Sequence, residues 1–487
     1  MTFRNALAWS LYGQFISYVV FFGSSVVIAR LLTPHEVGVF TIAVATIGVL
    51  NTLVAFDIGT YVVRATDLKP LTVNAAFTVN GLLSCAIAAA IYLFSVVQGE
   101  YLSSPDVAKV LAALAVTPLI GMFEFRPNMM LRREMNFRLI SMISIAKTLV
   151  GTPVTIVLAV NGYSYMSLAY GSIVGGVFGV ICTNLAARHH ASLRLSLYEA
   201  RQMVVFGVSM MSIGGLNAVA ARVSEIILGH MLGLAALGLY SRASSISSMV
   251  FDNIYGAITR VVFVRLSESF RNTGNVRDVF LGSFGMILAV MWPMQIGLAV
   301  LSGPAIYLLY GERWMGAASP LSLLMVAQSI ILCFGMNWEL FIIKNETGRQ
   351  VRYEAARAVV SVVTFTAGCL FNIAAAAVGR IAEAAFGFML YRPHINRMAE
   401  TRPGEFSTIY ANSAALTIAA VFPSLALMVS TDWSPRTSPP IIVGSVLLGV
   451  LFWLVVLARQ KHPLFAELRA VFDKLKLRCL RHVGVKN

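Results

Sequence analysis

Charged residues are scarce in this sequence of 487 residues. Asp, Glu, Lys and Arg make up 12% of it, against about 25% in ordinary soluble domains. Hydrophobic residues make up 58%, and long apolar runs recur along the chain. About 20 apolar residues cross the hydrocarbon of a bilayer. The composition therefore excludes a soluble globular protein and predicts an all-α membrane protein with many spans.

Paired cysteines are also lacking. Four of the five cysteines lie in apolar runs, one lies near the C-terminal end, and no two share an exterior loop. The sequence therefore offers neither a disulfide framework nor a CxxC metal pair. We expect the cysteines to act as small apolar fillers of the core. They are Cys85, Cys182, Cys333, Cys369 and Cys479.

Familiar catalytic motifs are absent. The chain has no HExxH, no GxxxxGK[ST] and no GxSxG in an aqueous loop. The acidic residues outside the apolar runs form no DxD-like pair, and the outer loops are short. An integral-membrane polysaccharide polymerase or glycosyltransferase usually needs a large loop or an acidic aqueous site. That class stays as an alternative, but the sequence favours a transporter without catalytic residues, metal ligands or a cofactor.

What the sequence does contain is a series of fourteen apolar segments, each long enough to be a transmembrane helix. Spans 11 and 12 are separated by a very short link. The predicted spans are 8–32, 38–62, 74–97, 109–126, 139–160, 164–187, 203–229, 238–264, 279–309, 316–343, 356–373, 375–391, 411–430 and 440–458.

Lysine and arginine are distributed unevenly between the two sides of these spans. With the N-terminus in the cytoplasm, 28 of the 37 Lys and Arg residues fall in inner segments and three in outer loops. Basic loops remain on the cytoplasmic side of a membrane. The asymmetry predicts that both termini are cytoplasmic, and it explains the net charge of +15 without a nucleic-acid partner.

One stretch occurs twice. VVIARLLTPHEVGVFTIAVA (Val26–Ala45) and IILGHMLGLAALGLYSRAS (Ile226–Ser244) align at an offset of 200 residues, so that Gly38 meets Gly238 and Leu32 meets Leu232. This repeat predicts two six-helix lobes related by an axis along the membrane normal, as in some transporters. The expected parts are an N-terminal lobe (1–187), a cytoplasmic linker (188–202), a C-terminal lobe (203–391), spans 13 and 14 (392–458) and a basic amphipathic tail (459–487).

Charges inside the predicted spans are the candidate functional residues, because they are costly unless they face a polar interior or a partner. Lys147 lies near mid-membrane in span 5. The other cations within spans include Arg30, Arg222 and Arg242. The acidic candidates are Asp57, Glu124, Glu225 and Glu339.

Two interpretations of these charges stay open. Arg222 with Glu225, and Arg380 with Glu383, are three residues apart and could form local ion pairs without a transport role. Arg30 could reach the outer headgroups. In the functional interpretation, the cations line a cavity for an anionic substrate such as a diphosphate, and the four acidic residues are proton or sodium sites.

Five stretches resemble the Wzx-type polysaccharide flippases of bacteria. ARLLTPHEVGVF at 29–40 is similar to their first outer turn, and FDIGTYVVRA at 56–65 to the exit of span 2. LRREMNFRLI at 131–140 resembles their inner loop before span 5. Two later outer turns also resemble those of the family: IILGHMLGLAALGLYSRASSI at 226–246 and LYGERWMGAASPLSLL at 309–324.

The resemblance implies the fold of the multidrug/oligosaccharidyl-lipid/polysaccharide exporter superfamily, with two six-helix lobes around a cavity and alternating access. By motif position, Asp57 and Arg64 fall on the family's span 2 pattern, so Arg64 joins the candidate cavity cations. In span 7 the family's acidic position corresponds to Ser224, with Glu225 adjacent, and the basic residue after Gly229 is replaced by His230. These departures weaken the transfer of a span 7 site to this chain.

The resemblance further implies an inner-membrane flippase that moves undecaprenyl-diphosphate-linked oligosaccharides to the periplasmic leaflet for exopolysaccharide, capsule or O-antigen synthesis. Coupling to a proton or sodium gradient is common in such proteins. The expected partners are the lipid-linked glycan, anionic lipids at the basic tail, and a polysaccharide polymerase with other export machinery. A lipid II or drug exporter of the same fold is the nearest alternative, although cations within the membrane disfavour a cationic drug.

Overall fold

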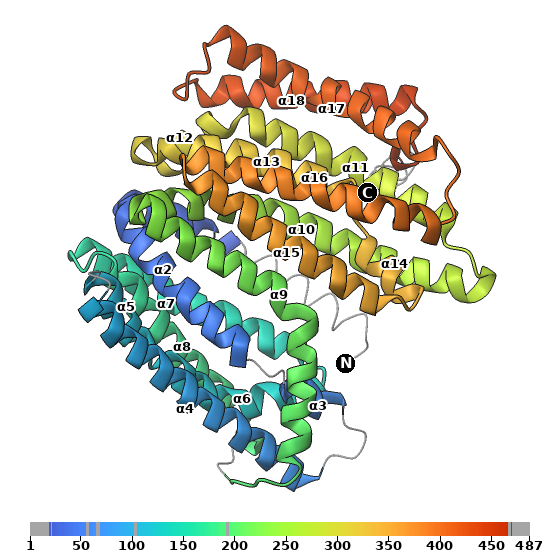
Figure 1. Ribbon diagram of the computed structural model, residues 1–487. Helices are drawn as coiled ribbons and strands as arrows, with labels where there is room; N and C mark the ends of the chain where they lie inside the picture. The colour runs from blue at the N-terminus through green and yellow to red at the C-terminus, as the bar shows by residue number, and fades with distance from the viewer. Residues whose placement is uncertain are drawn as a thin grey trace, which may run out of the picture. The chain divides into compact units, whose positions relative to one another are not determined.

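The computed structural model describes residues 19–20, 22–54, 58–64, 69–101, 105–190, 194–465 and 469, and every regular element in this part of the chain is a helix (Figure 1). Among these described residues, ten segments are long and apolar enough to cross a membrane, judged by length and composition. The predicted class, an all-α membrane protein with many spans, is therefore confirmed.

By its internal contacts the chain divides into a first unit, Met1–Ser241, and a second unit, Arg242–Asn487. The helices that begin in the first unit are α2 (Pro34–Val54), α3 (Ile58–Arg64), α4 (Pro70–Tyr101), α5 (Pro105–Leu114), α6 (Thr117–Arg133), α7 (Phe137–Val160), α8 (Met166–Ala186), η1 (Arg188–His190), α9 (Ala200–Leu232) and α10 (Leu234–Thr273).

The second unit contains the rest of α10 and the helices that follow it. These are α11 (Arg277–Val300), α12 (Ser302–Tyr310), η2 (Glu312–Ala317), α13 (Ala318–Leu332), α14 (Asn337–Ile343), α15 (Thr347–Cys369), α16 (Ile373–Met398), α17 (Glu405–Ser430) and α18 (Pro439–Arg459).

The described residues of each predicted span from the second to the fourteenth coincide with one helix or with successive helices. Residues 8–18 and 21 of the first span lie outside the described residues. The clearest difference concerns span 4, expected to end at residue 126. Helix α6 continues to Arg133, so the residues Leu131–Arg133 extend the helix and do not form a loop. The charges that close α6 lower its hydropathy, although they do not interrupt its backbone hydrogen bonds.

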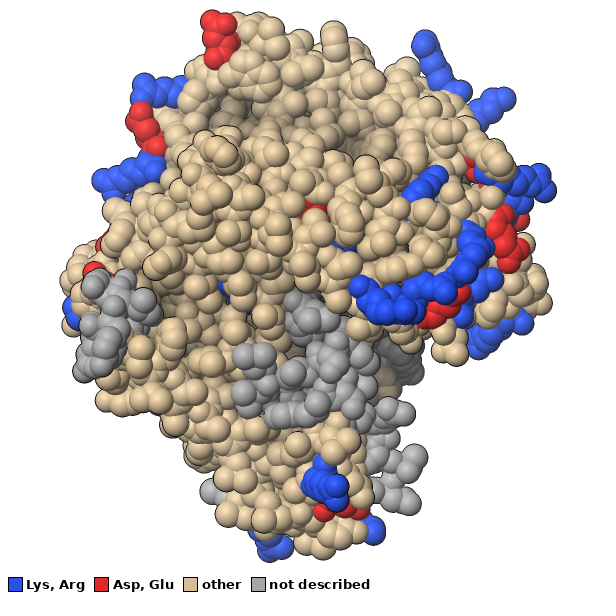
Figure 2. All heavy atoms as spheres, in the orientation of Figure 1, with Lys and Arg blue, Asp and Glu red and all other residues tan. Residues whose placement is uncertain are grey.

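Much of the protein surface is uncharged. On the face shown in Figure 2, Lys, Arg, Asp and Glu gather in small groups among uncharged residues. Large apolar side chains are exposed on many helices. On α18, for example, they include Ile441, Val443, Leu447 and Leu451. Exposed apolar area of this extent is expected where lipid replaces water around the helices.

The second unit is held by an aromatic core. Phe280, Phe284, Phe334, Phe341 and Tyr391 are almost completely buried and belong to one cluster, to which α10, α11, α14, α16 and α17 contribute. Phe284 meets Phe406 edge to face, with ring centroids 5.3 Å apart. Such pairs add to the free energy of burial.

The two copies of the repeated stretch pack against each other. A side chain at Gly38 of α2 would meet the carbonyl oxygen of Leu234, and one at Gly238 would meet that of Pro34. Gly38 corresponds to Gly238 and Pro34 to Leu234 at the offset of 200, so the two contacts are reciprocal. Thr41 also donates a hydrogen bond to its counterpart Ser241 at 3.3 Å. The copies therefore meet around a local two-fold axis.

Helix α2 begins at a capping box that only the first copy of the repeat has. The Thr33 amide donates to Glu36 Oε2 at 2.7 Å, and the Glu36 amide donates to Thr33 Oγ1 at 3.3 Å. This reciprocal pair satisfies two amides at the helix start. The Ser164 hydroxyl, in the turn between α7 and α8, donates to the same carboxylate. At the corresponding positions the second copy has Gly233 and Ala236.

Replacing Glu36 with alanine should lower the stability of the first unit. Loss of a cap costs about 1 kcal/mol, and this change also removes the link to Ser164. Glu36→Gln keeps an oxygen acceptor and should lose less. Thermal unfolding of the purified protein in detergent measures both effects. Equal melting temperatures for wild type and Glu36→Ala would contradict the role assigned to the capping box.

Candidate substrate-binding site

One cavity of the first unit has a volume of about 520 Å³ and is lined by residues of α2, α3, α4 and α6. Neutral hydrogen-bonding side chains line much of it: Asn51, Asn80, Ser84 and Asn128. Glu124 and Arg132 add charge. We call it the large cavity.

Helix α6 supplies the polar face of this cavity. Gly121, Glu124, Asn128 and Arg132 lie three or four residues apart, and residues at this spacing share one face of a helix. The apolar residues Phe125 and Met129 also border the cavity, and Met129 is buried. The spacing alone thus places an acid, an amide and a cation in a row along the cavity wall.

A second cavity of about 200 Å³ adjoins the first, between α6, α7 and α8. It shares Glu124, Asn128 and Arg132 with the large cavity and adds Ser144, Lys147 and Thr183. We call it the small cavity. The polar face of α6 therefore borders both spaces.

Lys147 reaches the small cavity across a glycine. A side chain at Gly179 of α8 would lie 2.9 Å from Lys147 Cδ, so the aliphatic part of the lysine fills the space above this glycine. The ammonium group of Lys147 then pairs with Glu124 Oε2 at 3.4 Å. The two side chains are 41% and 20% exposed. The structure thus brings together two of the sequence-predicted residues, from neighbouring helices and 23 positions apart.

Arg132 completes the charge of this site. Its Nε donates to Asn128 Oδ1 at 2.9 Å, which turns the guanidinium back along α6. Among the described residues Arg132 has no ion-pair partner. The small cavity therefore has two cations and one carboxylate, an arrangement that attracts an anion. Sequence reasoning missed Arg132 and Asn128, although their spacing from Glu124 could have revealed them.

The remaining candidates of the first unit lie elsewhere. Arg222 pairs with Glu225 on α9 at 2.9 Å, and its side chain lies across Gly48 of α2. Arg30 is exposed. Arg64 ends α3, but its side chain is outside the described part of the structure, and Asp57 is not among the described residues.

Arg242 and Glu339 belong to the second unit. The guanidinium of Arg242 lies over the ring of the buried Trp314, 5.6 Å from its centroid. Glu339 lies in the first turn of the short helix α14. Neither residue lines the two cavities described above.

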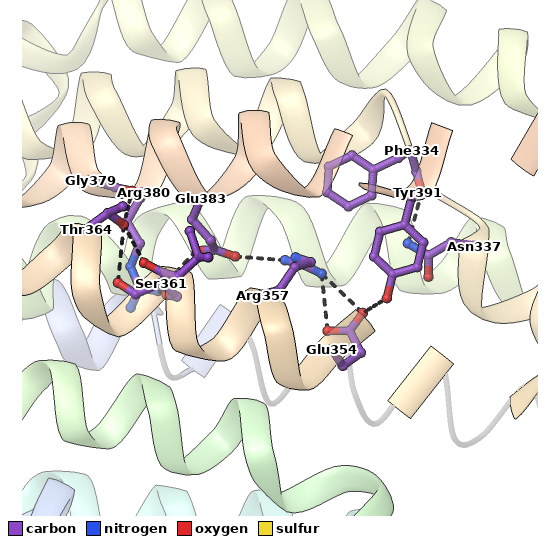
Figure 3. Close-up of polar contacts among 11 residues, drawn as sticks. Phe334, Asn337, Glu354, Arg357, Ser361, Thr364, Gly379, Arg380, Glu383 and Tyr391 are labelled. Atoms are coloured by element: carbon purple, nitrogen blue, oxygen red, sulfur yellow. Dashed lines mark hydrogen bonds and ion pairs between the residues drawn. The ribbon is translucent and has the colours of Figure 1, made fainter. Parts of the chain in front are cut away.

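An ion-pair network in the second unit extends the predicted pair of Arg380 and Glu383. Glu383 accepts from Arg357 at 2.9 Å and from Arg380 at 3.3 Å. Arg357 also donates to Glu354, which accepts from the Tyr391 hydroxyl at 2.6 Å. Figure 3 shows Arg357 between the two carboxylates. The charges of this network between α15 and α16 balance one another, which indicates a structural role.

Comparison with known proteins agrees with this architecture. The model of a family described as polysaccharide biosynthesis protein matches residues 27–319. The lipopolysaccharide biosynthesis protein WzxC of Escherichia coli is 24% identical over 302 residues, which cover 62% of this chain and 61% of that protein. The succinoglycan biosynthesis transport protein ExoT of Rhizobium meliloti is 22% identical over 68% of this chain and 67% of its own.

A solved structure of the lipid II flippase MurJ, in an inward closed conformation, has a similar fold. It superimposes with a TM-score of 0.72 at 12% identity and covers 92% of this chain and 98% of its own. The predicted fold is thereby confirmed. The chain is a multi-span membrane protein, and it belongs to the polysaccharide biosynthesis protein family.

Proposed function

We propose that this protein is an inner-membrane flippase for undecaprenyl-diphosphate-linked oligosaccharides, which it moves from the cytoplasmic to the periplasmic leaflet. The product serves exopolysaccharide, capsule or O-antigen synthesis. The observation that carries the proposal is the pair of adjoining cavities in an otherwise apolar helical unit. One offers several amides and a hydroxyl, the other adds Lys147, and Arg132 borders both. These groups suit the sugar and diphosphate parts of one amphipathic substrate.

The mechanism proposed is alternating access, driven by a proton or sodium gradient, between two six-helix lobes with spans 13 and 14 added. Carboxylates within spans are the candidate coupling sites: Glu124, Glu225, Glu339 and Asp57. Both termini are cytoplasmic in this proposal, and the basic tail contacts anionic lipid. A polysaccharide polymerase receives the exported unit.

Export of lipid II or of a drug by the same fold is the nearest alternative. Lys147 and Arg132 would repel a cationic drug. Lipid II also has a diphosphate, so the charges alone do not separate it from other lipid-linked glycans. The two proposals can be distinguished by identifying the lipid that accumulates in a strain without the protein.

Deleting the protein from its host should leave lipid-linked repeat units on the cytoplasmic leaflet. When the Lys147→Ala variant is expressed in this deletion strain, export should be at least about tenfold lower than with the wild-type protein. The reason is that a charge-assisted contact contributes about 1.5–3 kcal/mol. Lys147→Arg keeps the positive charge and should export better than Lys147→Ala. The measurement is the amount of surface polysaccharide together with the leaflet location of labelled lipid-linked units.

The amount of protein in the membrane must be measured for each variant, because a misfolded protein also fails to export. Lys109→Gln provides a control cation outside the cavities, whose partner Asp106 lies on the same helix. Normal export by a deletion strain without a second flippase would refute the proposed function. Normal export by a well-expressed Lys147→Ala protein would refute the role of the lysine.

A further inference from the structure

The two cavities of the first unit differ in their chemistry, although they share one wall. Neutral groups such as Asn51, Asn80 and Ser84 occur only in the large cavity, and Lys147 occurs only in the small one. We infer that the small cavity is a diphosphate subsite and the large cavity a subsite for the adjoining sugars, with Glu124 as an internal counter-ion that the diphosphate displaces from Lys147. This inference rests on the proposed function and assigns parts of the substrate to it.

The small cavity suits a small anion. Its volume of about 200 Å³ is less than half that of the large cavity, about 520 Å³. We therefore assign the diphosphate to the small cavity and the bulkier sugars to the large one. Both cations line it, whereas Glu124 provides its one carboxylate. An anion that enters therefore finds a positive site.

The position of Arg132 lets both cations reach one diphosphate. Glu124 and Arg132 are eight residues apart on α6, or about 12 Å along the axis. The hydrogen bond to Asn128, midway between them, directs the guanidinium back toward Glu124. Lys147 contacts Glu124, and both cations line the small cavity.

The large cavity is suited to sugars by its neutral groups. Asparagine side chains both donate and accept hydrogen bonds, and sugar hydroxyls do the same. With about 520 Å³ this cavity has room for sugar rings. Because Asn128 and Glu124 border both spaces, sugars attached to a diphosphate in the small cavity continue directly into the large one.

Glu124 links the two subsites by exchanging partners. In the structure it pairs with Lys147 at 3.4 Å. When a diphosphate occupies Lys147, the released carboxylate still borders the large cavity, where it accepts hydrogen bonds from sugar hydroxyls. An ionised carboxylate accepts and does not donate. Lys147 and Glu124 thus each have a partner before and after the exchange, which avoids an unpaired charge within the membrane.

Inorganic pyrophosphate binding to the full-length protein in nanodiscs of zwitterionic lipid tests the small cavity. Lys147→Gln and Arg132→Gln should each weaken binding about tenfold or more. Glu124→Gln should strengthen it several-fold, since the internal competitor loses its charge. Lys109→Gln is the matched control, because Lys109 pairs with Asp106 at the same 3.4 Å but outside both cavities. It should leave binding unchanged.

Two further measurements separate the subsites and the ligand source. Asn80→Ala should reduce export in cells while pyrophosphate binding stays normal, because Asn80 lines only the large cavity. Glycerophosphoglycerol, the headgroup of an anionic phospholipid, should compete weakly with pyrophosphate because it has a single phosphodiester. Equal competition would identify the small cavity as a phospholipid site and overturn the inference.

The inference fails if Glu124→Gln weakens pyrophosphate binding as Lys147→Gln does, or if Lys109→Gln has the same effect as the cavity variants. It also fails if a correctly folded wild-type protein, shown by its monodisperse elution and melting temperature, does not bind pyrophosphate although it restores export in cells. That last result would leave the proposed function intact. Normal export without the protein would instead refute the function and leave the anion site standing.

Discussion

Replacing Gly38 with alanine should prevent the two copies of the repeated stretch from packing. The added Cβ atom would lie 1.8 Å from the carbonyl oxygen of Leu234. No side-chain rotation can relieve this clash, because the carbonyl is a backbone group and the backbone fixes the position of Cβ. Overpacking of a core costs about 1–3 kcal/mol and more where the backbone must move. We expect a loss of about 3 kcal/mol or more, with a lower melting temperature and little protein in the membrane.

The reciprocal contact provides a second test of the same prediction. A Cβ atom at Gly238 would lie 1.9 Å from the Pro34 carbonyl oxygen, so Gly238→Ala should be as damaging as Gly38→Ala. Gly282 of α11 is the control, because a side chain there meets no atom within 4 Å. Gly282→Ala should be neutral or stabilise the protein by up to about 1 kcal/mol. Stable, abundant Gly38→Ala protein would show that α2 and α10 do not approach each other this closely.

The offset of 200 residues between the repeated stretches could be seen in the sequence, but the contact between them could not. The similarity of the two stretches indicates that they have the same local structure, but it does not show that they are in contact. The contact depends on carbonyl groups at Pro34 and Leu234, which any residue could supply. The glycines at positions 38 and 238 are the sequence feature that reflects this contact.

The candidate site shows a similar limit. Lys147 could be recognised because a cation in an apolar run is costly and needs a partner. Its pairing with Glu124 depends on how α6 and α7 pack, which sequence spacing does not determine. Arg132 was assigned to a loop because charges at the end of α6 lower its hydropathy while the helix continues to Arg133. Hydropathy thus ended the predicted span just before the cation that completes the site.

The same effect concealed half of the network in the second unit. Arg380 and Glu383 could be paired from their spacing of three residues. Glu354 lies at the charged start of α15, two residues before the predicted span began at residue 356, and Arg357 is the second residue of that span. The structure shows that these residues continue the pair across two helices (Figure 3).

Glu383→Gln should therefore destabilise the second unit strongly. Glu383 is 7% exposed and accepts from both Arg357 and Arg380. Removing one member of a buried ion pair costs about 3–5 kcal/mol, because the remaining charge is left without its partner. Here the amide would leave the two arginines with Glu354 alone. Thermal unfolding in detergent, with the melting temperatures of variant and wild type compared, measures the loss.

An exposed pair of the same length provides the control. Arg436 donates to Glu312 at 2.9 Å, and both side chains are more than half exposed. Glu312→Gln should change stability by about 1 kcal/mol or less, since exposed ion pairs contribute little. Equal effects of Glu383→Gln and Glu312→Gln would show that the network is hydrated and not buried.

A second substitution distinguishes loss of charge balance from loss of packing. If Glu383→Gln is damaging because it leaves a cation unpaired, Arg380→Met added to it should restore much of the stability, since burying an apolar side chain avoids the cost of an uncompensated charge. If Glu383→Gln is damaging because it disturbs packing, the stability losses caused by Glu383→Gln and by Arg380→Met should add. Recovery in the double variant means that the network stabilises α15 against α16 through its neutrality. A transport role would then require export to fail in that stable double variant, which the balanced charges of the network lead us not to expect.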